Sequence, residues 1–260
     1  MGVLARVCVA HRWFVIGLLL AGIAAAPTIA RATDQPEVDV QLILAVDASL
    51  SIDAEEAQLQ RQGYVAALTD PKIIKAIRSG PMGQIAVFYF EWASEFYQRV
   101  IVDWTVIKDE ASAQAVADKI ASTPYRGERR TSISGAIRYA AQQFDKGYTS
   151  ERKVIDVSGD GRNNSGPPME QARAEVLAQG IVINGLPILN DKPSFGGYGG
   201  FGPDPYLDRY YQESVVGGPG SFMVPAAGFQ SFDEAILSKL IREISRVPSS
   251  GRQFASSPSN

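Results

Sequence analysis

The chain has 260 residues, of which 45% are hydrophobic, and its formal net charge is −3. This length and composition are sufficient for one large domain with a buried core. The slightly acidic balance argues against a nucleic-acid-binding protein, because the phosphate backbone demands a concentrated basic surface.

Residues 1–32 have the layout of a secretory signal peptide. Basic residues precede an apolar run over 13–26, and the small residues Ala30 and Ala32 follow it. A membrane anchor is the alternative, but the run is shorter than the roughly 20 residues that a spanning helix needs. We therefore predict cleavage after Ala32 and export across the inner membrane to the periplasm.

Cleavage would remove Cys8 and His11, which are the only cysteine and the only histidine of the chain. The mature protein would then have no thiolate and no imidazole. This excludes Ser-His-Asp and Cys-His catalysis, and zinc sites built from His and Cys. Metal binding would depend on oxygen ligands, which select hard cations such as Mg²⁺, Mn²⁺ or Ca²⁺.

From Val38 onward, short apolar runs alternate with segments of helical periodicity. The predicted strands cover residues 38–46, 85–90, 100–102, 154–157, 181–186 and 222–224. The second and third runs lie close enough to form a hairpin, which predicts one antiparallel edge strand. The other strands alternate with helices, and the clearest of these begin at Ile133 and Phe232. The pattern predicts an α/β fold with a doubly wound, mostly parallel sheet and helices on both faces.

The remaining segments are predicted to be irregular. Residues 33–37 read as a short leader before a single domain over 38–247, and residues 248–260 as a disordered tail. Residues 190–220 read as a loop insertion, because their first part is dense in Gly and Pro. The aromatic residues of this insertion either face a partner or pack on their own domain.

The first predicted strand ends on Asp47, which is followed by Ser49 and Ser51. In open parallel sheets, ligands bind beyond the carboxyl ends of the strands. A chain that bends there from strand to helix can direct one carboxylate and two hydroxyls at a single point. The alternative is an ordinary turn in which Ser51 also caps the following helix.

Two later residues have suitable positions to complete such a site. Thr131 stands at the beginning of the strongly periodic helix, and Asp160 follows the 154–157 strand between Gly159 and Gly161. The carboxyl ends of parallel strands meet at one edge of the sheet, so we expect these residues to converge with those of the first turn.

These motifs resemble the metal-ion-dependent adhesion site (MIDAS) of von Willebrand factor A domains, a Rossmann-like fold. Asp47, Ser49, Ser51, Thr131 and Asp160 match that motif residue by residue, over a resemblance that covers about residues 38–246. Within this superfamily the chain is most similar to a bacterial exported family of unknown function. The resemblance implies that the three hydroxyls contact the metal and that the two acids act largely through water. Where the usual pattern has Thr-Asp-Gly, this chain has Gly159 before the acid.

The resemblance implies a binding module rather than an enzyme. A divalent cation, Mg²⁺ or alternatively Mn²⁺ or Ca²⁺, would keep one open position that an Asp or Glu of a partner protein fills. A Mg²⁺- or Mn²⁺-assisted hydrolase of phosphate or peptide substrates is the first alternative. A scaffold domain without metal is the second.

Neighbouring residues offer further candidates. The basic run over 126–130 is either a solvated loop or a reader of acidic partners. Glu91 and Trp92 either line the rim of the site or pack in the core. Asn163 and Asn164 are expected to shape the turn beside Asp160.

Overall fold

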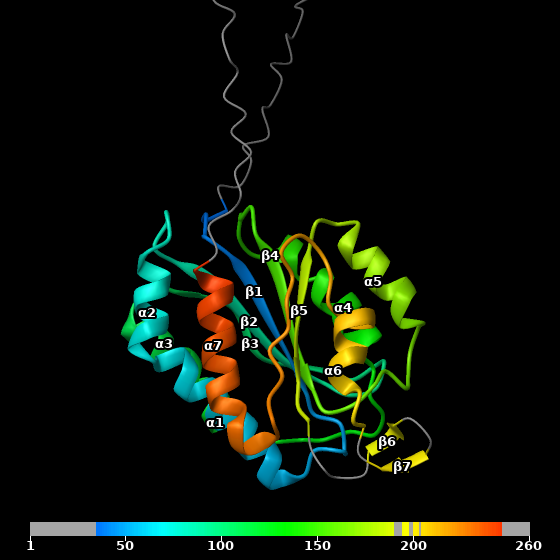
Figure 1. Ribbon diagram of the computed structural model, residues 1–260. Coiled ribbons are helices and arrows are strands. Elements are labelled where there is room, and N and C mark those ends of the chain that lie inside the picture. The colour runs from blue at the N-terminus through cyan, green and yellow to red at the C-terminus, as the bar shows by residue number, and fades with distance from the viewer. Residues whose placement is uncertain (1–34, 190–193, 198–199, 203, 246–260) are drawn as a thin grey trace, which may run out of the picture. The chain divides into compact units, whose positions relative to one another are not determined.

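The computed structural model describes residues 35–189, 194–197, 200–202 and 204–245 (Figure 1). The predicted signal peptide, the first residues of the predicted leader and the predicted tail lie outside these ranges. Within the ranges, no helix has both the length and the apolar character needed to cross a membrane.

Five strands form the main sheet. They are β1 (Gln41–Asp47), β2 (Ile85–Trp92), β3 (Gln98–Ile107), β4 (Lys153–Gly159) and β5 (Val182–Pro187). Their order is β3-β2-β1-β4-β5, and each neighbouring pair is parallel except β2 and β3, which are antiparallel. The prediction of a mostly parallel α/β sheet with one antiparallel edge strand is therefore confirmed.

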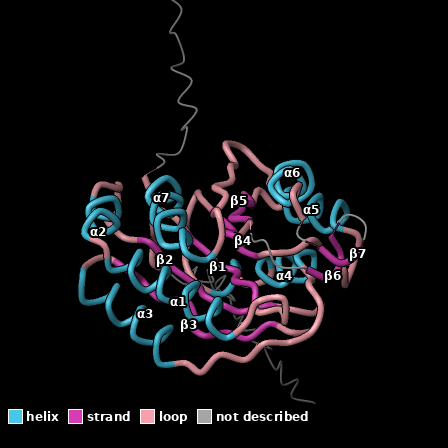
Figure 2. Tube along the Cα trace, turned by 60° about the horizontal axis from the view of Figure 1, so that its bottom comes forward, coloured by secondary structure: helices cyan, strands magenta, loops and turns pink. Residues whose placement is uncertain are grey.

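Helices cover both faces of this sheet. They are α1 (Ala54–Thr69), α2 (Pro71–Arg78), α3 (Glu110–Ser122), α4 (Ile133–Ala141), α5 (Met169–Leu177), α6 (Leu207–Tyr210) and α7 (Phe232–Ile244). Short 3-10 turns, η1 (Phe144–Lys146) and η3 (Phe229–Ser231), follow α4 and precede α7. The first three helices and α7 pack on one face, and α4, α5 and α6 pack on the other (Figures 1 and 2).

Strand β1 lies at the centre of the sheet and is buried along its whole length. Its side chains alternate between the two faces, as they do in any extended strand. Leu42 and Leu44 pack with the α1 and α7 layer, while Ile43 and Ala45 pack with the α4 and α5 layer. A strand covered on both faces reads as a continuous apolar run, which explains the sequence from residue 42 to 46.

The segment 190–220 contains regular structure where the sequence led us to expect a loop. Strands β6 (Ser194–Gly197) and β7 (Gly200–Gly202) pair as a small antiparallel sheet. Helix α6 then continues into η2 (Tyr211–Val215), a π-helical turn. Glycine favours loops in general, but the main-chain pairing of two short strands requires no side chains.

The prediction of a strand over 222–224 is wrong. This segment has a single parallel bridge to the sheet, between Met223 and Gly185 of β5. Its apolar residues instead fill space beside β5, since the side chains of Phe222 and Met223 pack on neighbouring elements.

The strand order creates a switch point between β1 and β4. From β1 the chain adds β2 and β3 on one side of the sheet, and later adds β4 and β5 on the other side. The connections that leave the carboxyl ends of β1 and β4 therefore diverge, since α1 packs on one face of the sheet and α5 on the other. This is the place where doubly wound sheets bind their ligands.

A buried ionic cluster fixes α7 to the sheet. Lys239 Nζ lies 2.5 Å from Asp156 Oδ1 on β4 and 2.6 Å from Glu243 Oε1 on its own helix. Asn184 of β5 donates a hydrogen bond of 2.8 Å to the same Glu243 oxygen. All four residues are buried. Two carboxylates thus share one ammonium group in the interior.

We predict that this cluster makes the stability of the domain depend on pH. Burial, followed by the charge of Glu243, raises the pKa of Asp156 to about 7, although Lys239 opposes the shift. Folding then favours proton binding at Asp156, so its contribution is complete in acid and is lost as the pH rises through about 7. The urea midpoint of the wild type should fall between about pH 4 and pH 7 more steeply than that of Asp156→Asn. Parallel midpoint curves for the two proteins would contradict this prediction.

Candidate functional site

Asp47 ends β1 and organises the turn that follows. Its Oδ1 accepts a hydrogen bond of 2.7 Å from the amide of Ser49. Helix α1 is capped by Asp53, whose side chain accepts from two amides of the first helical turn and forms a capping box. Ser51 is therefore not the helix cap, and its hydroxyl is directed to a different partner.

Short hydrogen bonds connect this turn to the end of β4. Ser51 Oγ donates to Asp160 Oδ1 over 2.7 Å, and the hydroxyls of Ser49 and Ser51 lie 2.9 Å apart. Since Ser51 gives its only proton to Asp160, Ser49 is the donor between the two serines. The structure thus brings four of the five predicted residues into one connected group across the switch point.

Thr131 lies at the same edge of the sheet, against the loop that follows Asp160. Its amide donates to Asn164 Oδ1 over 2.9 Å, and its carbonyl accepts from the Asn164 amide over 2.8 Å. Its Oγ1 is 3.7 Å from the point where a Cβ on Gly161 would lie. The preceding residue, Arg130, has a φ of 77°, a left-handed conformation that turns the chain into position before the helix.

Asn163 and Asn164, in the loop after β4, form hydrogen bonds with the beginning of α4 and with the residue Thr131 that precedes it. Asn163 Oδ1 accepts from the amide and the hydroxyl of Ser134 in the first turn of α4, over 2.9 and 3.0 Å. Asn164 holds Thr131, as described above. The sequence predicted only that both asparagines shape a turn. Their hydrogen bonds to Thr131 and Ser134 join residues about 30 positions apart, and no local sequence pattern predicts them.

The group is polar, yet all its members except the half-buried Ser51 are buried. Asp47, Ser49, Thr131 and Asp160 are each at most 5% exposed. Burial, and next the charge of Asp160, raises the pKa of Asp47 well above its ordinary value, while hydrogen bonding with Ser49 opposes this shift. Two carboxyl groups that share one pocket in this way disfavour a second negative charge.

Glu91 and Trp92 end β2 beside β1, where Trp92 is the register partner of Asp47, and neither forms an exposed rim. Both are buried, and Glu91 pairs with Arg61 of α1 through Oε1 and with Arg99 at 3.7 Å through Oε2. These contacts connect α1 and β3 through the end of β2. Packing in the core is therefore the correct one of the two expectations for these residues.

The oxygen set fits a small divalent cation. In an octahedral shell with ligands at about 2.1 Å, neighbouring oxygens lie about 3.0 Å apart. The 2.9 Å between the Ser49 and Ser51 hydroxyls matches this spacing. Among the described residues, no cluster contains three or more His, Cys, Asp or Glu side chains. A cation here would depend on neutral hydroxyls together with the two acids.

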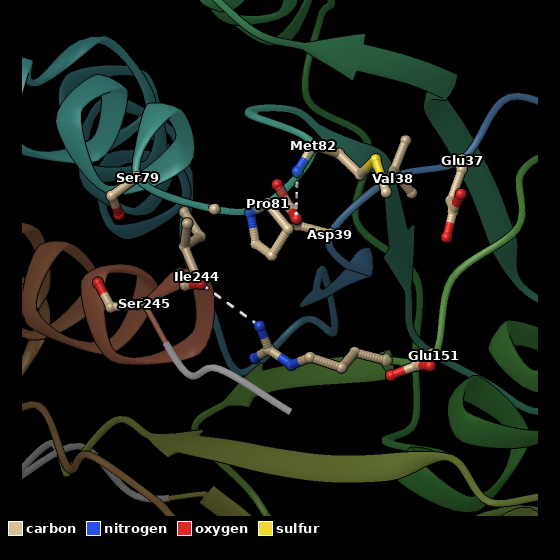
Figure 3. Close-up of a pocket in the computed structure, with 11 residues that line it drawn as sticks. Glu37, Val38, Asp39, Ser79, Pro81, Met82, Glu151, Ile244 and Ser245 are labelled. Carbon is tan, nitrogen blue, oxygen red and sulfur yellow. Dashed lines mark hydrogen bonds between the residues drawn. The ribbon is translucent and has the colours of Figure 1, made fainter. Parts of the chain in front are cut away.

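A cavity of about 240 Å³ lies at the opposite edge of the sheet (Figure 3). Residues before β1, after α2, before β4 and at the end of α7 line it, among them Asp39, Met82, Glu151 and Ile244. These lie at the amino ends of β1 and β4, whereas Asp47 and Asp160 lie at the carboxyl ends. The cavity is therefore separate from the candidate site.

A family model described as "Protein of unknown function (DUF1194)" matches residues 37–248. The chain belongs to this family. No curated protein matches the sequence. The match covers the whole five-stranded sheet and all the residues of the site.

Solved structures share the fold at low sequence identity. Proximal thread matrix protein 1 from the mussel byssus, with a zinc-occupied MIDAS motif, is 15% identical with a TM-score of 0.54, and the match covers 82% of this chain and 50% of that chain. BatB from Bacteroides thetaiotaomicron is 18% identical with a TM-score of 0.52, over 80% and 100% of the two chains. A von Willebrand factor type A protein from Catenulispora acidiphila is 12% identical with a TM-score of 0.54, over 80% and 43%. The fold is that of a von Willebrand factor A domain, and the chain spans about half the length of the mussel protein.

We predict that the site does not tolerate a side chain at position 159. A Cβ there would lie 2.7 Å from Asp47 Oδ2 and 2.9 Å from the Tyr211 hydroxyl. Gly159→Ala should therefore destabilise the domain by about 1–3 kcal/mol in urea unfolding, as overpacking does elsewhere. Gly161→Ala is the matched control, because its Cβ would meet Thr131 only at an ordinary 3.7 Å. Equal stabilities of the two variants would show that the space over Gly159 is not restricted.

Proposed function

We propose that this domain is an exported binding module that holds Mg²⁺ or Mn²⁺ at the five-residue site and binds a protein partner through it. The observation that carries the proposal is the connected group of buried oxygens at the switch point between β1 and β4. A bound cation supplies positive charge and a coordination position that a carboxylate of the partner can fill. Ca²⁺ remains an alternative ion for the same oxygens.

The residues divide into two kinds by charge. Ser49, Ser51 and Thr131 contribute neutral hydroxyls, which bind a cation without neutralising it. Asp47 and Asp160 supply the negative charge, and both are fixed by hydrogen bonds from the β1–α1 turn. Because few anionic groups reach the ion, its attraction for an Asp or Glu of another protein is preserved.

The rim of the site favours an acidic partner that also carries apolar groups. Leu50 and Phe96 are 59% and 89% exposed. The loop over 124–131 lies between them, since its Glu128 carbonyl accepts from the Leu50 amide and its Arg126 carbonyl accepts from the Tyr97 hydroxyl beside Phe96.

This loop carries three exposed arginines, Arg126, Arg129 and Arg130. Within the part of the chain that the structure describes, none of their guanidinium groups has an ion-pair partner. They concentrate positive charge directly before Thr131 in a chain whose net charge is negative. Such a surface complements an acidic segment and increases its rate of association.

We predict that Asp47→Ala abolishes cation binding and leaves the domain folded. The substitution leaves the amide of Ser49 without its acceptor but also removes a buried carboxyl that repels Asp160, so the metal-free domain should still unfold in one cooperative transition. Calorimetric titration with Mn²⁺ is the measurement. Asp118→Ala, at an exposed position of α3, is the control and should bind Mn²⁺ as the wild type does. Undiminished affinity in Asp47→Ala would reject the site.

We predict that peptides selected from a random display library on the Mg²⁺-loaded domain are rich in Asp and Glu. A chelator should release them, because the contact depends on the cation. The double variant Arg126→Glu and Arg129→Glu should select fewer acidic peptides, while its Mn²⁺ affinity stays within about twofold of the wild type. Acidic peptides that stay bound in the presence of the chelator would contradict the proposal. Turnover of phosphate esters or peptides in the presence of Mn²⁺ would favour the hydrolase instead.

A further inference from the structure

The space that Gly159 leaves open on β4 receives two oxygen atoms from other elements, Oδ2 of Asp47 and the hydroxyl of Tyr211. Both residues are buried, and neither oxygen has a hydrogen-bond partner of normal geometry among the described residues. A carboxylate oxygen can only accept a hydrogen bond, whereas a phenol can donate one. Buried polar atoms in folded proteins are nearly always paired. These two oxygens are chemically suited to each other.

The chain makes specific room for the Tyr211 ring. Tyr211 begins the π-helical turn η2, and π-helical turns are frequent at functional sites. A Cβ on Gly185 of β5 would lie 2.8 Å from the ring carbon Cδ1 of Tyr211. Glycines on two neighbouring strands, β4 and β5, therefore accommodate the hydroxyl and the ring of one tyrosine. The phenol keeps its proton at neutral pH, because the ordinary pKa of tyrosine is about 10.

We propose that Tyr211 is a positioning residue of the site, whose hydroxyl donates a hydrogen bond to Oδ2 of Asp47, directly or through one water molecule. With Oδ1 bonded to the Ser49 amide, both oxygens of Asp47 are then fixed. The MIDAS motif usually has a threonine at the position that Gly159 occupies in this chain. Tyr211, from the 190–220 segment, places a hydroxyl next to that position. The effect on cation binding rests on the function proposed above, whereas the contact with Asp47 does not.

Tyr211→Phe tests this role, because phenylalanine keeps the ring and removes only the hydroxyl. Mn²⁺ affinity measured by calorimetry should fall ten- to a hundredfold, about the loss found when a partner of a metal-binding side chain is removed. Tyr64→Phe is the matched control. Its hydroxyl is also buried and lies 3.1 Å from Ser158 Oγ on the same strand, but it does not face Asp47. This control should bind Mn²⁺ within about twofold of the wild type.

Urea unfolding of the metal-free domain provides a second readout that a general loss of packing would not reproduce. Tyr211→Phe should lower the midpoint in the wild type, but should lower it less, or not at all, in the Asp47→Ala background. Equal midpoint shifts in the two backgrounds would overturn the proposal, as would unchanged Mn²⁺ affinity in a domain that does bind Mn²⁺. If the wild type binds no Mn²⁺, the proposed function is contradicted, and the unfolding cycle alone decides whether Tyr211 acts on Asp47.

Discussion

Asp47 and Asp160 are two buried carboxyl groups at the carboxyl ends of β1 and β4, where burial, and next the charge of Asp160, raises the pKa of Asp47. Such a pair is costly in a low-dielectric interior unless donors or a cation compensate for it. The amide of Ser49 and the hydroxyl of Ser51 provide part of this compensation. The other residues of the site place hydrogen-bond donors and hydroxyl groups around these two carboxyl groups.

The domain contains a second pair of buried carboxylates, which offers an internal comparison. Asp156 and Glu243 share the ammonium group of Lys239, so that cluster carries its own counter-charge. Asp47 and Asp160 are instead surrounded by hydroxyls, amides and a tyrosine. The cluster of Asp156, Glu243 and Lys239 connects α7 to the sheet. Asp47 and Asp160 lie instead at the switch point, where doubly wound sheets bind their ligands. In the function that we propose, a cation from solution compensates the charge of Asp47 and Asp160, as Lys239 compensates that of Asp156 and Glu243.

Much of this organisation could be predicted from the sequence. The continuous apolar run before Asp47 identified the central strand, and the motif at Asp47, Ser49 and Ser51 placed a polar turn at its end. Contacts made by elements of ambiguous composition could not be predicted. Gly and Pro in the 190–220 segment concealed β6, β7 and the helical turn that carries Tyr211. The approach of Tyr211 to Asp47 depends on two glycines in separate strands, and no local pattern relates them.

The most direct test of the account is a crystal structure of the domain soaked in Mn²⁺, with data collected to reveal the anomalous signal of manganese. The account predicts one strong peak about 2.2 Å from the hydroxyl oxygens of Ser49, Ser51 and Thr131. The same peak should be absent from crystals of Ser49→Ala grown and soaked in the same way. A wild-type crystal without a peak at this position, or with manganese bound only elsewhere, would contradict the account.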